Sequence, residues 1–156
     1  MKKMRYQQLT DFLLSQLPEK YRKHFYSWME NGKLLNDGKQ VTATGIEIAQ
    51  IEYQAIFYFD QLPFKEINPY KLLALVQIWL NENDDWQYRD FQTPFNIEMI
   101  DDSTAELDIT ITFSEPITAE QDDLGDLMID GECYRFDEVA VHTAQAIDVA
   151  VRIDSE

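Results

Sequence analysis

Residues suited to nucleophilic or metal chemistry are scarce in this chain of 156 amino acids. It has one cysteine, Cys133, and two histidines, His24 and His142, so an internal disulfide and a zinc site with paired Cys or His ligands are excluded. The five glycines form no glycine-rich phosphate loop, and no serine lies in a nucleophile elbow. We therefore predict no catalytic residues, no cofactor and no bound metal. Cys133 is interpreted as a structural residue in a reducing compartment.

Long apolar runs and basic residues are also few. The longest apolar run, Leu72 to Leu80, contains Gln77 and is too short to span a bilayer. The first 18 residues begin with basic side chains, but their interspersed polar residues favour an amphipathic helix over a signal peptide. Thirteen Lys and Arg against 29 Asp and Glu give a net charge of −16, which argues against binding nucleic acid through a basic surface. Neither a membrane nor a nucleic acid is expected as a partner.

The charge is divided unevenly along the chain. Residues 1–39 hold eight of the thirteen bases and four acids, so this segment carries +4 and the remainder carries −20. Two solvated faces of opposite sign would explain the division. Alternatively, a subunit with one basic and one acidic end would suit oriented stacking or head-to-tail assembly.

Hydrophobic periodicity predicts an α+β fold, with a mostly antiparallel sheet packed against two or three helices. A helix is expected over about Arg5 to Leu17 because its apolar residues share one face. The segment from Glu19 to His24 is compatible with a short second helix. Asn68 as N-cap and Pro69 at the first helical position predict another helix, ending near Asn81.

Alternation of apolar and polar residues predicts the strands. One long strand is expected from Ile46 to Asp60, with a bulge near Ala49-Gln50, where the alternation changes phase. Asp-Gly at residues 130–131 predicts a small hairpin between Leu127 and Phe136. Asn31-Gly32 favours a hairpin turn, with a helix that ends at a glycine cap as the alternative.

Residues 95–113 predict a further hairpin, turning at Asp101-Asp102-Ser103. Its second strand alternates strictly, which assigns five residues to the core: Ala105, Leu107, Ile109, Ile111 and Phe113. The opposite side carries Glu106, Asp108, Thr110 and Thr112, and no chemistry accompanies them. These four residues are predicted to face solvent or to form a subunit interface.

The remaining features admit two interpretations each. The aromatic residues Trp86, Tyr88 and Phe91 are assigned to the core rather than to a partner interface. The adjacent acids at 84–85, 101–102 and 122–123 are interpreted as solvated turn residues rather than weak Ca²⁺ ligands. We divide the chain into an α+β domain, 1–115, and an acidic C-terminal extension, 116–156, that contains a hairpin and packs on the same domain. An exposed or mobile stretch is expected around Glu120 to Asp126.

The order of these pieces resembles a known family. An amphipathic N-terminal helix precedes an aromatic segment ending in Glu30-Asn31-Gly32, a strand with Phe57 and Phe59, and a helix ending in Trp79-Leu80. Phe95-x-Ile97, Asp101-Asp102-Ser103 and Leu107-Asp108-Ile109-x-Ile111 then follow. This order resembles the tail completion protein R (GpR-like) family of Peduovirus-type contractile-tailed temperate phages, over about residues 1 to 115 and toward Phe136.

The resemblance implies a structural role in virion assembly. Such proteins complete the tail at its head-proximal end, and tail terminators of this general kind are α/β subunits of a ring, expected to be a hexamer. The implied partners are copies of itself, the tail tube protein and the head–tail connector. The implied locations are the host cytoplasm during assembly and then the virion tail. No catalytic residue comes with the family.

A different class of function also fits the composition. Prophages encode acidic proteins that mimic DNA and inhibit a basic host protein, and a charge of −20 over residues 40–156 could present carboxylates in place of phosphates. An enzyme would require clustered carboxylates, or Cys133 lying beside His24 or His142. The structural role is the leading prediction.

Overall fold

The computed structural model describes residues 2–35, 40–41, 45–83 and 92–140, which form an α+β fold. The N-terminal half contains β1 (Lys2–Lys3), α1 (Arg5–Gln16), the 3₁₀ helix η1 (Glu19–His24), β2 (Phe25–Leu35), β3 (Gln40–Val41) and β4 (Gly45–Leu62). The remainder contains α2 (Pro69–Asn83), β5 (Phe95–Met99), β6 (Ala105–Gln121), β7 (Leu127–Ile129), β8 (Glu132–Phe136) and β9 (Val139–Ala140). The predicted fold class is confirmed.

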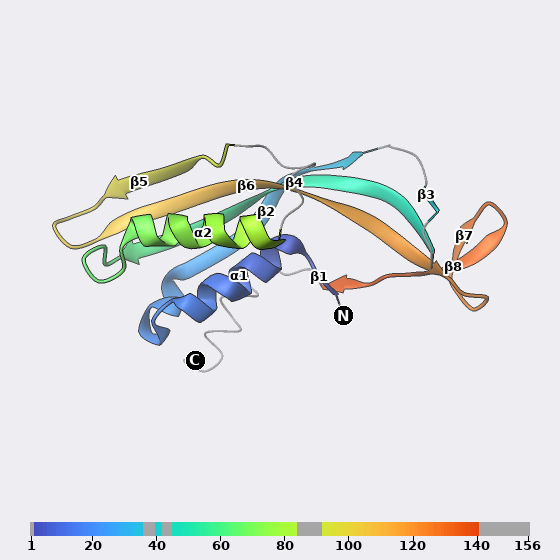
Figure 1. Cartoon of the computed structure of the whole chain (residues 1–156), viewed down its shortest axis with the longest axis horizontal. Helices are drawn as coiled ribbons and strands as arrows, with labels where there is room; N and C mark the ends of the chain where they lie inside the picture. The colour runs from blue at the N-terminus through green and yellow to red at the C-terminus, as the bar shows by residue number, and fades with distance from the viewer. Residues whose placement is uncertain (1, 36–39, 42–44, 84–91, 141–156) are drawn as a thin grey trace.

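The main sheet is antiparallel throughout and has the strand order β2-β4-β6-β8-β7, with β3 beside β4 and β5 beside β6. Strands β1 and β9 form a separate parallel pair. The long strands β4 and β6 form the centre of the main sheet, and α1 and α2 lie together on one side of them (Figure 1). The β7–β8 hairpin projects from the opposite end of the long axis to the β5–β6 turn (Figure 1).

The core lies between the helices and one face of the sheet. All five residues predicted for the core from the alternation of β6 are buried. Four of them, Leu107, Ile109, Ile111 and Phe113, share one hydrophobic cluster with alternate residues of β4 and with the inner faces of α1 and α2. Ala105 is also fully buried. Burial of apolar surface on this scale is the main favourable term in folding.

Side chains at the element ends explain several boundaries. The Asn68 Oδ1 accepts a hydrogen bond from the Tyr70 N–H at 2.9 Å, and α2 begins at Pro69, as predicted. The Asp101 carboxylate accepts the N–H groups of Ser103 and Thr104 at 2.8 and 2.7 Å. These bonds hold the pKa of Asp101 below its ordinary value and close the predicted turn between β5 and β6.

One local prediction is wrong: Asn31-Gly32 is neither a hairpin turn nor a helix end. Strand β2 continues through both residues to Leu35, and its pairing with β4 shifts register between Glu30 and Lys33. Asn31 has a φ of 56°. Asparagine tolerates positive φ in bulges as well as in turns, and in this strand it forms part of a bulge. The Asn31 amide donates a hydrogen bond to the Gln54 side chain at 2.7 Å.

The other irregularities follow the sequence more closely. The pairing of β4 with β6 shifts register between Glu47 and Ala49, next to the predicted bulge. The β7–β8 hairpin turns at Asp130 and Gly131, whose φ angles are 51° and 84°. Strand β6 extends beyond the predicted end at residue 113 and crosses position 115 without a break, so Glu120 belongs to it. The division of the chain at residue 115 stays a prediction.

Candidate functional site

The four predicted interface residues lie together on the sheet face that points away from α1 and α2. Glu106, Asp108, Thr110 and Thr112 are each half-buried, and they alternate with the core residues of β6. Register places Thr110 beside Ile56 of β4, which in turn lies beside Trp28 of β2. We call this surface, from β2 across β4 to the even-numbered residues of β6, the open sheet face.

Three aromatic residues give the open sheet face an apolar centre. The ring centroid of Tyr58 lies 6.3 Å from that of Tyr26 and 6.4 Å from that of Trp28, the latter pair meeting edge to face. Desolvation raises the pKa of the Tyr58 hydroxyl, and the negative charge of Asp60 raises it further. The hydroxyl therefore stays protonated and donates to the Asp60 carboxylate at 3.3 Å. Half-buried aromatics rimmed by carboxylates and hydroxyls are typical of protein-binding surfaces.

The described residues bring together no group for nucleophilic or metal chemistry. His24 lies in η1 and Cys133 in β8, at opposite ends of the molecule (Figure 1). Among the residues that the structure describes, no three Asp, Glu, His or Cys side chains are arranged to hold a metal ion. His142, the acids at 84–85 and the aromatic residues Trp86, Tyr88 and Phe91 lie outside the described residues.

A buried polar cluster beneath the N-terminus of α1 was not predicted. The Tyr53 hydroxyl of β4 donates a hydrogen bond to the Glu115 carboxylate of β6 and accepts the Tyr6 N–H of α1 at 3.3 Å. The cluster therefore ties α1 to both long strands. A sequence signal existed, because Glu115 continues the core-facing odd positions after Phe113.

Burial sets the charge behaviour of this cluster. Burial raises the pKa of the Glu115 carboxyl. The hydrogen bond from Tyr53, the hydrogen bond from the Arg5 backbone and the positive charge of Arg5 oppose this rise. Burial, followed by the charge of Glu115, raises the pKa of the Tyr53 hydroxyl. The hydroxyl thus remains a donor, and the carboxyl holds its proton to a higher pH in the folded than in the unfolded protein.

We expect Glu115→Gln to gain stability relative to the wild type as pH rises. Because the folded protein binds the Glu115 proton more tightly, the wild-type free energy of unfolding falls between the ordinary glutamate pKa and the raised folded value. The variant keeps an acceptor for Tyr53 but lacks this titration. Urea unfolding of both proteins from pH 4 to pH 8 measures the difference, and a variant that loses relative stability with rising pH would contradict the assignment.

Comparison with known proteins gives two matches. The family model described as P2 phage tail completion protein R (GpR) matches residues 1–138. A curated relative from Haemophilus phage HP1 (strain HP1c1), named "Uncharacterized 19.2 kDa protein in rep-hol intergenic region", is 52% identical over 157 residues, which cover 99% of this chain and 95% of the relative. No solved structure matches the chain. Within the described residues, neither α1 nor α2 nor η1 has the length and apolar character needed to cross a membrane.

Proposed function

Because the chain belongs to the P2 phage tail completion protein R family, we propose that it completes a phage or prophage tail at the head-proximal end. The supporting observation is the family match over residues 1–138, which spans all but the last two residues of the described fold. Family membership makes it a component of the phage tail. We further propose that it assembles in the host cytoplasm before it joins the virion tail.

The assembly form that suits this role is a ring of identical subunits, which we propose to be a hexamer. A ring that closes a tube needs two different surfaces, one for the tail tube protein and one for the head–tail connector. The division of charge, +4 over residues 1–39 and −20 over the remainder, supports a subunit with two different ends. This ring acts structurally and performs no chemical reaction.

The open sheet face is the surface that we assign to a subunit interface. It combines the aromatic centre of Tyr26, Trp28 and Tyr58 with the polar side chains of β6. Aromatic residues supply much of the binding energy in protein interfaces, and carboxylates and hydroxyls at the rim fix orientation.

The oligomeric state tests the proposed function. Mass photometry of the purified full chain across a concentration series, with and without the tail tube protein, should show a discrete oligomer, with hexamer as the expected species. A pull-down from host lysate with this chain as bait, at low and at high salt, separates this role from inhibition of a basic host protein. The proposal would be overturned if the chain stayed monomeric, did not bind tail proteins, and bound a basic host protein only at low salt.

Thr110→Lys is expected to prevent assembly while the fold survives. The new ammonium would stand on the open sheet face beside Ile56, where a docked neighbour would remove its hydration. The free energy of unfolding should change by less than about 1 kcal/mol, because the side chain at 110 points away from the core. Gln16→Lys provides the control, since it adds the same charge at an exposed end of α1. Normal assembly of both variants would remove the open sheet face from the interface.

A further inference from the structure

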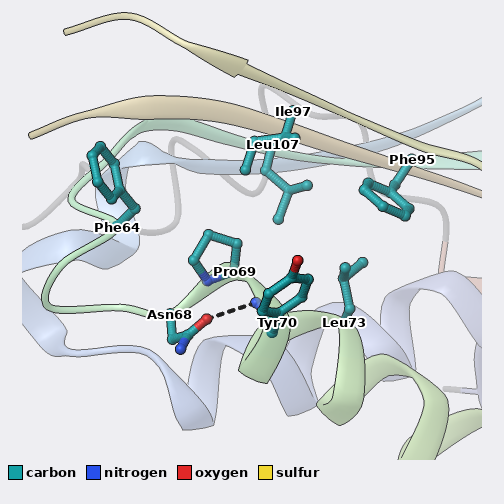
Figure 2. A pocket seen from close by; sticks show the side chains of 8 residues that line it. All are labelled: Phe64, Asn68, Pro69, Tyr70, Leu73, Phe95, Ile97 and Leu107. Carbon is teal, nitrogen blue, oxygen red and sulfur yellow. Dashed lines mark hydrogen bonds between the residues drawn. The ribbon is translucent and has the colours of Figure 1, made fainter. Parts of the chain in front are cut away.

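An apolar groove lies between the first turns of α2 and the edge strand β5. Its volume is about 540 Å³, and Leu107 of β6 forms part of its floor. Figure 2 shows Pro69, Tyr70 and Leu73 on one side of the groove, facing Phe95 and Ile97 of β5 on the other. We call this feature the α2–β5 groove.

The walls of the α2–β5 groove are unusually exposed for apolar side chains. Tyr70 is 81% exposed and Phe95 is 51% exposed. The pleat of β5 explains the arrangement, because Ile97 pairs with Leu107 on the helix side while Glu98 pairs with Glu106 on the open sheet face. A groove with exposed apolar walls suits the insertion of an apolar side chain from another molecule.

The opposite end of the molecule presents an apolar side chain on an ordered turn. Leu124 precedes β7 and is 95% exposed. Asp122 holds the turn, because its carboxylate accepts the Leu124 N–H at 2.9 Å and its carbonyl oxygen accepts the Gly125 N–H at 2.8 Å. Gly125 packs so closely on β8 that an added Cβ would lie 2.1 Å from the Tyr134 carbonyl oxygen. The turn is thus held in a form that displays Leu124.

The charge of the 122–126 turn complements the charge on the α2 side of the groove. Residues 120–138, which contain the turn and the hairpin, hold eight acids and one base. The segments 19–24 and 63–73, which adjoin the α2 side of the groove, hold five bases and two acids, whereas residues 92–102 on the β5 side hold three acids and no base. These two segments lie side by side, since the Lys20 ammonium is 3.6 Å from the Glu66 carboxylate. The N-terminus of α2 adds a partial positive charge at the same place.

We propose that the 122–126 turn of one copy docks in the α2–β5 groove of a second copy, with Leu124 as the inserted side chain. One copy cannot fill its own groove, because the hairpin and the groove lie at opposite ends of the long axis (Figure 1). A contact between two different surfaces of identical subunits builds a closed ring or an open filament. The inference rests on the proposed ring and names one of its contacts.

Leu124→Asp should weaken self-association about 10- to 100-fold, because a buried leucine is replaced by a carboxylate in an apolar groove. Leu34→Asp is the matched control, since Leu34 is also exposed, at 61%. It lies on β2, away from the α2–β5 groove and from the 122–126 turn. Circular dichroism should show an unchanged fold for both. Normal assembly of the Leu124 variant would overturn the inference and leave the ring intact, and loss of assembly in the Leu34 variant alone would move the contact to β2.

Cross-linking tests the contact independently of ring closure. In the Cys133→Ser background, mixing a Tyr70→Cys protein with a Leu124→Cys protein under mild oxidation should give disulfide-linked dimers. Pairing Tyr70→Cys with Leu34→Cys should give none. A wild-type monomer with efficient 70–124 cross-linking at high concentration would reject the ring and retain the contact. A defined oligomer without 70–124 cross-linking would reject the contact and retain the ring.

Discussion

Ile111→Asp is expected to abolish folding or to lower the free energy of unfolding by more than about 4 kcal/mol. Ile111 is almost completely buried in the middle of β6, opposite Ala55 of β4, within the cluster that joins the sheet to both helices. A carboxylate at this position would lose its hydration, and the apolar side chains around it offer no compensating charge. The substitution therefore tests the assignment of the odd-numbered residues of β6 to the core.

Thr112→Asp is the matched control for this prediction. It introduces the same side chain on the next residue of the same strand, but on the open sheet face beside Gln54. The change in the free energy of unfolding should stay below about 1 kcal/mol. Urea unfolding followed by circular dichroism measures both variants. Similar losses at positions 111 and 112 would mean that both faces of β6 are covered in the isolated subunit.

Phe59→Ala should cost about 3 to 5 kcal/mol of the free energy of unfolding. The Phe59 ring stacks on Phe25 with centroids 4.7 Å apart, at the point where β4 pairs with the start of β2. Truncation would remove this contact and leave a cavity beneath η1, whose Tyr21 hydroxyl donates to the Asp60 carbonyl oxygen at 2.8 Å. The substitution thus weakens the attachment of η1 to β4.

Phe59→Leu separates the loss of volume from the loss of the aromatic ring. It restores most of the side-chain volume, so we expect a cost below about 1.5 kcal/mol. Thermal unfolding of both variants, at one protein concentration and one pH, provides the comparison. An alanine variant as stable as the leucine variant would show that the site collapses around the truncation and that the Phe25–Phe59 stack contributes little.

Strong periodic patterns made much of the fold predictable. The alternation of β6 identified its buried residues because the period of a strand separates the two faces completely. Asn68-Pro69 located the start of α2 because capping is a local interaction between neighbouring residues. The same alternation placed Glu106, Asp108, Thr110 and Thr112 on one face, as the structure has them, and their role as an interface remains a prediction.

The features that the sequence did not reveal depend on contacts between distant segments. Asn31 favours positive φ in a turn and in a bulge alike, and only pairing with β4 selects the bulge. Strand β6 extends to Gln121 because β4 and β8 supply hydrogen-bonding partners for a segment rich in acids. The α2–β5 groove is formed by residues from four parts of the chain, so no local pattern indicates it.

Removal of this reading frame from an inducible phage genome tests the central claim most directly. Electron microscopy of the lysate should show filled heads and separate tails with incomplete head-proximal ends. Supply of the wild-type chain from a plasmid should restore joined, infectious particles. Normal numbers of intact tailed virions without the protein would contradict a role in tail completion.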